Sequence, residues 1–289
     1  MPAPLIDPML APWLGVWLFD ADASEYGAQP PPSDAAYTLT AGTGGVRFHV
    51  QWRLGAEPWQ EVAFVVPLGV APQPVVGPTG ATSPAETAST SPAETAAVWG
   101  ELTDDALSTF VQQGGVVTHS ARRTLERGAS SEDDVMCVVQ RSPDATGAVV
   151  ETIGRYRRSR VKQVMCYRRD LKMRKGKIAA QVAHASMAAL LRRDVGDESQ
   201  IVIETDGALG WWLRRGFAKV VLSVEDEASL LAVRDAAAAE GLPHALITDS
   251  GRTEFGGVPT RTTVAVGPAP VAWIDRITGH DGLVATKLA

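Results

Sequence analysis

The sequence has little cysteine and no long apolar run. Cys137 and Cys166 are the only cysteines among 289 residues, and their spacing fits neither a metal-ligand set nor a disulfide framework. The apolar run at 9–19 is too short to span a bilayer. No Lys or Arg precedes Arg47, so the charged start of a secretory signal is missing. These absences argue against a disulfide scaffold and a membrane protein, and we expect a reducing, cytoplasmic location.

Acidic and basic residues are distributed unevenly along the chain. Residues 1–154 hold 6 Lys and Arg and 18 Asp and Glu, whereas residues 155–289 hold 21 Lys and Arg and 15 Asp and Glu. Eleven basic residues and one acid, Asp170, fall within 155–177. This density suits a phosphate backbone, although a solvated basic linker is the alternative. The length favours two domains of about 150 residues each, and we place them at 1–158 and 162–289.

Helical periodicity is scarce in the first half, where short strand-like runs are separated by Gly, Pro, Asp and Ser. The clearest run, 46–53, alternates apolar and polar residues, as a half-buried strand does. Similar runs predict an antiparallel barrel or sandwich; they lie at 36–41, 62–66, 116–125, 134–140 and 148–157. Residues 72–97 carry a tandem octapeptide, TSPAETAS and TSPAETAA, and few large apolar side chains. They predict a flexible surface insertion.

The start of the chain carries Trp-Leu-Gly-Val-Trp at 13–17, and a basic strand, Arg-Tyr-Arg, follows at 155–157. Together with the strand signals, this resembles the lipocalin-like barrels, whose first strand carries Gly-x-Trp. The resemblance implies that Trp17 closes one end of the barrel and that Arg155 or Arg157 packs over it. Whether such a barrel holds a small apolar ligand or is filled by its own side chains stays open.

The second half alternates strands and helices, which predicts an α/β layer sandwich. The expected strands lie at 163–168, 219–224, 244–248 and 262–266. One expected helix begins after Met173, and two others span 225–240 and 271–277.

Two stretches of this half are candidate sites. In MRKGKIAAQVAHA (173–185), basic residues surround Gly176 where a helix should begin, so free backbone N–H groups and positive charge converge on one spot. Such a helix start can hold an anion. Lys177, Gln181 and His184 share one face, with His184 expected to be packed or hydrogen-bonded. In TDSGRT (248–253), a glycine permits a tight turn from which Asp249 can point outward. A solvated helix start and an ordinary turn are the alternatives.

These stretches belong to a series of blocks. In order they are RRDLKM at 168–173, RKGKIAAQVAHA at 174–185, WWLRRG at 211–216, DSGRTE at 249–254, TRTTVAVGPAP at 260–270 and ITG at 277–279. Over 162–289 the chain resembles the archaeal and eukaryotic type of peptidyl-tRNA hydrolase. The resemblance implies a three-layer α/β sandwich with a small mixed sheet, a homodimer through this domain, and hydrolysis of the peptidyl-tRNA ester by water without metal or cofactor.

Carried over position by position, the resemblance implies a catalytic set of Lys177, Asp249, Thr253 and Thr262. We expect Asp249 to orient or deprotonate water, Lys177 to bind the oxyanion, and the threonines to position water or the ester carbonyl. The residues expected to bind tRNA phosphates are Arg168, Lys172, Arg174, Lys175 and Arg252.

The chain departs from the family pattern at Arg174, Phe217, Glu254 and Pro259, and its tail is longer. A silent tRNA- or protein-binding module is therefore one alternative function. A carrier that binds a small apolar ligand through the barrel is another.

Overall fold

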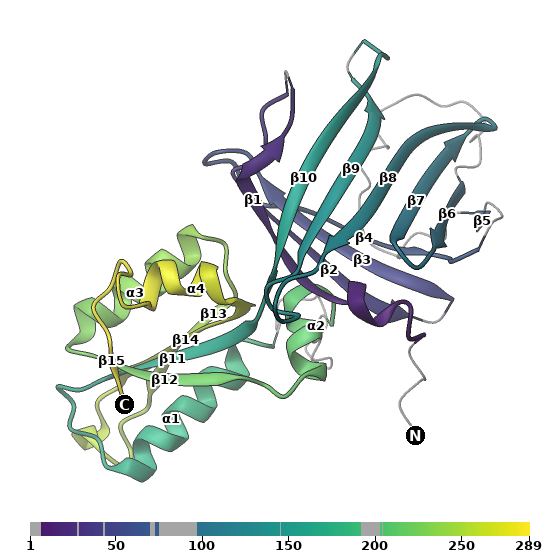
Figure 1. Ribbon diagram of the computed structural model, residues 1–289. Helices are drawn as coiled ribbons and strands as arrows, with labels where there is room; N and C mark the ends of the chain where they lie inside the picture. The colour runs from purple at the N-terminus through teal and green to yellow at the C-terminus, as the bar shows by residue number, and fades with distance from the viewer. Residues whose placement is uncertain are drawn as a thin grey trace. The chain divides into compact units, whose positions relative to one another are not determined.

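A computed structural model gives the structure of residues 7–27, 29–42, 44–69, 73–74, 97–144, 146–191, 203 and 205–289. The chain divides into two compact units, Met1–Ser159 and Arg160–Ala289, seen in Figure 1 as a purple-to-teal unit of strands and a teal-to-yellow unit of strands and helices. The predicted insertion at 72–97 lies almost entirely outside the described residues. No helix within the described ranges combines the length and apolar character needed to cross a membrane.

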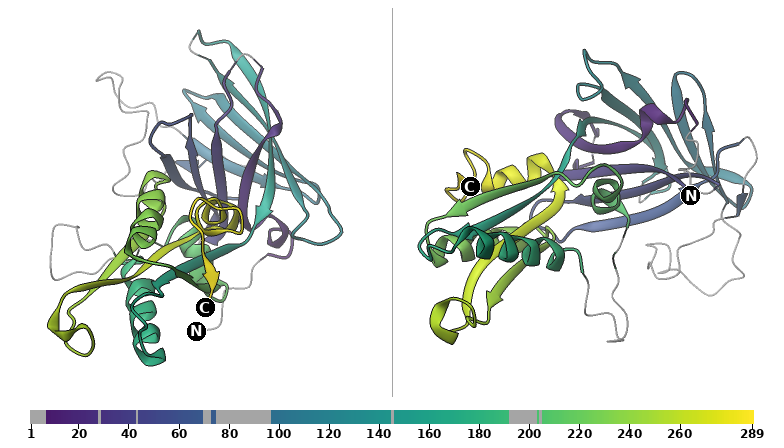
Figure 2. Two further views of the ribbon diagram at one scale, coloured as in Figure 1. Left: turned by 90° about the vertical axis from the view of Figure 1, so that its left-hand side faces the viewer. Right: turned by 90° about the horizontal axis from the view of Figure 1, so that it is seen from below.

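The first unit is one antiparallel sheet that curls into a nearly closed barrel, as predicted (Figures 1 and 2). A 3-10 helix, η1 (Ala11–Trp13), precedes the strands. The strands are β1 (Gly15–Glu25), β2 (Asp34–Gly42), β3 (Gly45–Arg53), β4 (Gln60–Val66), β5 (Gln73–Pro74), β6 (Ala97–Leu102), β7 (Ala106–Gln113), β8 (Val116–Glu126), β9 (Val135–Pro143) and β10 (Val149–Ser159). Their order is β4-β3-β2-β1-β10-β9-β8-β7-β6-β5. Strands β6 and β7 were not among the predicted runs.

The two ends of the sheet meet just after β4. A bridge joins Leu68 to Gly100 of β6, and the Gly100 amide donates to the Pro67 carbonyl oxygen at 2.8 Å. Side chains of alternate residues point inward and form the core. Those that are almost wholly buried include Trp17, Leu39, Phe48, Leu107 and Met136.

Trp17 is completely buried, and the arginine that covers it is Arg158, so the prediction of Arg155 or Arg157 is wrong. The Arg158 guanidinium lies 4.1 Å from the centroid of the Trp17 ring, and the two residues face each other across β1 and β10. Arg155 and Arg157 lie on the other face of β10, where they pair with acidic residues of the outer surface. The strand was identified correctly, but its inward face was assigned one residue out of phase.

The second unit is a three-layer sandwich around a five-stranded mixed sheet of order β13-β14-β11-β12-β15. The strands are β11 (Val161–Arg168), β12 (Lys219–Val224), β13 (His244–Asp249), β14 (Thr260–Pro270) and β15 (Lys287–Leu288). Strands β11 and β12 are parallel, and the other pairs are antiparallel. The short strand β15 lies in the longer tail and extends the sheet beyond the predicted strands.

Helices cover both faces of this sheet, as Figure 1 shows. They are α1 (Lys175–Ala188), α2 (Gly207–Arg214), α3 (Glu227–Ala239) and α4 (Val271–Thr278), with the 3-10 helix η2 (Phe255–Gly257) in the β13–β14 connection. Helix α1 packs on β11, β13 and β14, and α3 and α4 lie on the opposite face. Small core residues, Ala185 of α1 and Ala265 of β14, let α1 approach the sheet closely, with Met165 of β11 between them. The polar face of α1 is thereby placed beside the end of β13.

Candidate active site

The start of α1 supplies the first part of the site. Arg174 occupies the N-cap position with extended backbone, and no side chain caps the helix. The first backbone N–H groups of α1 are therefore left without a side-chain acceptor, which gives this end its affinity for anions. Lys177, one turn in, lies on the face of α1 that is directed toward β13 and the turn that follows it.

The turn after β13 supplies the second part. Gly251 has a φ of +77°, and a Cβ built on it would lie 2.4 Å from the Val258 carbonyl oxygen. Only glycine fits this conformation and this close approach without strain. The Gly251 amide donates to Asp249 Oδ1 at 2.8 Å, so the turn itself holds the carboxylate in place.

Three of the predicted catalytic residues meet at this point. Lys177 Nζ donates to Asp249 Oδ2 at 2.6 Å and to Thr253 Oγ1 at 2.9 Å. The side chains of Lys177 and Asp249 are 11% and 12% exposed. An ammonium group has three N–H donors; two of them are engaged here, the third has no hydrogen-bond acceptor among the described residues, and the Phe255 ring centroid lies 5.7 Å from Nζ. The arrangement presents a positioned positive charge at the surface of the second unit.

Gln181 also belongs to this network, and sequence reasoning did not assign it to the site. It is 1% exposed, and its Nε2 donates to Asp249 Oδ2 at 2.8 Å. Its Oε1 accepts from Thr262 Oγ1 at 2.6 Å. Thr262 is completely buried, so it supports Gln181 from behind and does not reach a substrate, contrary to the expected role. The signal that could have identified Gln181 was its place on the same helix face as Lys177.

The hydrogen bonds around Asp249 define its charge. The hydrogen bond from Lys177 is the largest of the effects that lower the pKa of Asp249, and the Gly251 amide and Gln181 also lower it, against an opposing effect of burial. Donors that bind the ionised form of a carboxyl group lower its pKa. Asp249 is therefore an anion at neutral pH and a weak base.

Arg174 and Glu254, two positions at which the chain departs from the family pattern, form an ion pair with each other at the edge of the site. Arg174 Nε donates to Glu254 Oε1 at 2.8 Å, and the Arg174 side chain is 79% exposed while that of Glu254 is 17% exposed. Glu254 directly follows Thr253 in the chain. The acid at Glu254 therefore comes with its own neutralising partner. Pro259 is exposed in the same connection.

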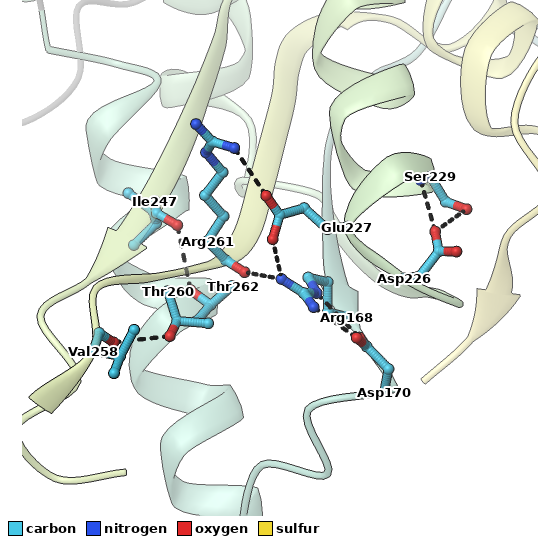
Figure 3. A network of polar contacts seen from close by, with 10 residues as sticks. All are labelled: Arg168, Asp170, Asp226, Glu227, Ser229, Ile247, Val258, Thr260, Arg261 and Thr262. Atoms are coloured by element: carbon cyan, nitrogen blue, oxygen red, sulfur yellow. Dashed lines mark hydrogen bonds and ion pairs between the residues drawn. The ribbon is translucent and has the colours of Figure 1, made fainter. Parts of the chain in front are cut away.

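Arg168 is not available to a phosphate, and its expected role is corrected. Figure 3 shows its guanidinium between two carboxylates, with Nη2 at 2.6 Å from Asp170 Oδ2 and Nη1 at 2.6 Å from Glu227 Oε2. It also donates to the Arg261 carbonyl oxygen at 3.1 Å, and its side chain is 10% exposed. Arg168 therefore ties the end of β11 to α3 and β14.

The other predicted phosphate ligands lie on the surface. Lys172, Arg174, Lys175 and Arg252 are all exposed, the first three just before or within the first turn of α1 and the last in the turn beside Asp249. His184 is also exposed, so of its two expected roles, packed or hydrogen-bonded, the packed one is wrong. Among the described residues, no cluster of three or more His, Cys, Asp or Glu side chains could hold a metal ion.

Comparison with known proteins identifies the second unit. A family model described as peptidyl-tRNA hydrolase PTH2 matches residues 161–283. A peptidyl-tRNA hydrolase of Thermococcus onnurineus is 42% identical over 127 residues, 43% of this chain and 98% of the relative. One of Methanopyrus kandleri is 44% identical over 41% of this chain and 93% of the relative. A probable peptidyl-tRNA hydrolase 2 of Drosophila melanogaster is 43% identical, but the match spans only 59% of its length and 41% of this chain.

Solved structures match the other unit. Crystal structures of the fluorescent protein UnaG, one of the wild type and one of a point mutant, both give a TM-score of 0.32 at 12% identity. The matches cover 52% and 53% of this chain and 99% of each UnaG chain. At this level of similarity they carry no argument about what the barrel binds.

Proposed function

Since the chain belongs to the peptidyl-tRNA hydrolase PTH2 family, a family of carboxylic ester hydrolases, we propose that its second unit hydrolyses the ester between peptide and tRNA. Water attacks the ester carbonyl, and the products are the free peptide and a tRNA with its terminal ribose hydroxyl restored. The observation that carries the proposal is the Lys177 ammonium, held by Asp249 and Thr253 with one N–H donor left over. That donor has the position and charge to bind an oxyanion.

Each side chain has a distinct role in this scheme. As water attacks, negative charge develops on the carbonyl oxygen, and Lys177 stabilises it. Thr253 accepts a hydrogen bond from Lys177, so its own hydroxyl proton is free to position the water or the ester. Because the pKa of Asp249 is lowered, this carboxylate serves better to orient Lys177 than to remove a proton. The proton lost by the water is finally taken up by the departing ribose oxygen.

Gln181 and Thr262 are positioning residues in the same scheme. Gln181 fixes Asp249, and the buried hydroxyl of Thr262 fixes Gln181. The free N–H groups at the start of α1, with Lys172, Lys175 and Arg252 around them, would bind phosphates of the tRNA acceptor end. The acidic surface of the barrel would repel the same backbone, so tRNA contacts are confined to the second unit.

Release of labelled peptide from an N-acetyl-aminoacyl-tRNA by the full chain tests this function. Lys177→Met should lower kcat by about 10²–10³, the usual loss when one oxyanion donor is removed. Arg234→Ala is the matched control, because Arg234 lies on α3, on the opposite face of the sheet from α1, and its loss should leave the rate unchanged. Circular dichroism would verify that both variants fold.

Other outcomes point elsewhere. Tight, salt-sensitive tRNA binding by the wild-type chain without any hydrolysis would identify a silent binding module. Full activity of Lys177→Met would overturn the assignment of the site. The homodimer that the resemblance implies stays a prediction, and sedimentation velocity of the full chain measures it.

A further inference from the structure

The barrel contains a cavity of about 360 Å³, so it is not completely filled by its own side chains. Most of the wall is apolar, with Trp52 of β3, Phe64 of β4 and Val111 of β7 among its residues. Leu54 and His119 also line it and are exposed, so the cavity reaches solvent on their side. The volume lies at the lower end of the roughly 300–1,000 Å³ that is usual for small-molecule sites.

One full positive charge lies inside this cavity. Arg123 of β8 lines it and is only 3% exposed. Its neighbour Arg122 is on the outer face of β8 and pairs with Asp105 at 2.9 Å. No Asp or Glu lines the cavity, and Arg123 forms no ion pair within the described part of the chain. A buried arginine without a carboxylate is unusual, because guanidinium stays charged at any physiological pH.

The contacts of Arg123 leave its hydrogen-bonding capacity incomplete. Nη1 donates to Thr109 Oγ1 at 3.1 Å and to the Ala121 carbonyl oxygen at 3.3 Å, whereas Nε has no partner. The guanidinium carbon lies 4.7 Å from the centroid of the Phe48 ring. Packing against a ring uses the flat face of a guanidinium, and its N–H donors point outward in its plane. Because Arg123 lines the cavity and its hydrogen bonds to Thr109 and Ala121 engage Nη1 alone, an acceptor that enters the cavity can bind at the edge of the guanidinium.

Tyrosines and not acids surround this charge. Tyr37 and Tyr156 line the cavity, with ring centroids 4.8 Å apart, and the guanidinium carbon lies 5.6 Å from the Tyr37 ring centroid. Burial raises the pKa of Tyr156 well above its ordinary value, so this phenol is neutral and cannot balance the charge. Burial also lowers the pKa of Arg123, and this effect is opposed by the charge interaction and hydrogen bond with Tyr37 and by the charge interaction with Tyr156. The cavity thus carries a net positive charge that its own walls do not compensate.

We propose that the barrel binds a small amphipathic monocarboxylate, whose carboxylate pairs with Arg123 and whose apolar body fills the space beside Trp52 and Phe64. A carboxylate matches the planar edge of the guanidinium and supplies the missing acceptors. A single negative charge is favoured because, among the described residues, Arg123 is the only Lys or Arg that lines the cavity. This site is independent of the ester hydrolysis proposed for the second unit.

The first test compares two ligands that share one apolar body. The full chain is titrated calorimetrically with 4-phenylbutanoate and with 4-phenylbutan-1-ol. We expect the acid to bind about 10- to 100-fold more tightly than the alcohol, the range given by a hydrogen bond to a charged group. The acid should also raise the melting temperature of the chain, since it binds the folded state alone. This comparison needs no variant.

The second test removes the positive charge from the cavity. Arg123→Gln should abolish the preference for the acid, while Arg122→Gln, one residue along on the outer face of β8, should preserve it. Acid and alcohol binding equally well, a preference that survives in Arg123→Gln, or failure of both ligands to bind the wild-type chain would each overturn the proposal. If Arg123→Gln does not fold, the comparison of acid with alcohol still decides.

Discussion

Each unit holds a cation that is largely withdrawn from solvent, Lys177 in the second unit and Arg123 in the barrel, and these two cations differ in what they face. Lys177 meets a carboxylate of its own chain at 2.6 Å, and that carboxylate receives further hydrogen bonds from Gln181 and the Gly251 amide. Arg123 is more deeply buried and meets a hydroxyl, a carbonyl oxygen and aromatic rings. In the second unit the charges are balanced before any substrate arrives. In the barrel the balancing charge has to come from a ligand.

This contrast explains how two similar side chains can serve different ends. A pre-formed ion pair keeps Lys177 in one position, which a site that stabilises a transition state requires. An unpaired cation is costly to bury, and the cost is recovered when an anion binds. The polar network of the second unit is thus suited to reaction, whereas the single charge in the barrel is suited to recognition.

The largest expected effect is on stability. Replacing each cation by methionine should change the unfolding free energy of its unit in opposite directions. Lys177→Met leaves the Asp249 carboxylate without its cation, and we expect the unfolding free energy of the second unit to fall by roughly 2–3 kcal/mol, somewhat less than for a fully buried pair. Arg123→Met removes an uncompensated charge and should stabilise the barrel by about 1 kcal/mol. Hydrogen exchange of peptides from β13 and from β8 measures the two units separately in one chain.

Arg122→Met is the control for the barrel, because its partner Asp105 is on the surface, where an ion pair contributes little. If Arg123→Met and Lys177→Met destabilise their units equally, Arg123 is already compensated within the protein, and the comparison between the two cations fails.

The residues that sequence alone could identify are those that a local motif carries. Lys177 and Asp249 stood out because a helix start and a glycine turn can be read from neighbouring residues, and the resemblance of the ordered blocks then implied their catalytic roles. Gln181 was seen on the right face of the helix but not assigned, because its importance depends on Thr262, 81 positions away. Arg168 belonged to a matching block, yet its partners on α3 come from the packing of the unit. Tertiary partners were the part that no local pattern contained.

The barrel shows a second reason for such misses. Its strands could be predicted from alternation, but β10 is basic on both faces, so the sequence did not say whether Arg157 or Arg158 points inward. The cavity was harder still. It exists because inward side chains from β3, β4, β7 and β8 do not meet across the barrel, which depends on the curvature of the whole sheet. The sequence alone therefore did not distinguish Arg123 from the other basic residues of the strands.

A change at Gln181 sharpens the account of the second unit, with a smaller effect than loss of Lys177. Gln181→Leu keeps the volume but removes the donor to Asp249 and the acceptor of Thr262, so we expect hydrolysis to fall by roughly 10-fold through loss of one charged hydrogen bond. His184→Ala, an exposed position one turn along the same helix, should leave the rate unchanged. Initial rates with N-acetyl-aminoacyl-tRNA measure both. Equal rates for wild type and Gln181→Leu would reduce Gln181 to a packing residue.

The smallest expected effect concerns the pair formed by Arg174 and Glu254. Arg174→Gly leaves an acid beside Thr253, which should raise KM for tRNA about 2- to 3-fold, and Glu254→Gln frees a cation and should lower it by a similar factor; each corresponds to the roughly 0.2–1 kcal/mol of an exposed ion pair. The double variant should return to near the wild-type value, because the two changes cancel in charge. Measuring KM for all four chains at low and high salt tests this, since screening should shrink the differences.

Additive losses in both single variants would mean that the two residues act separately on the substrate. A restored KM would show that the second unit balances charge at the edge of its site as it does at Lys177 and Asp249.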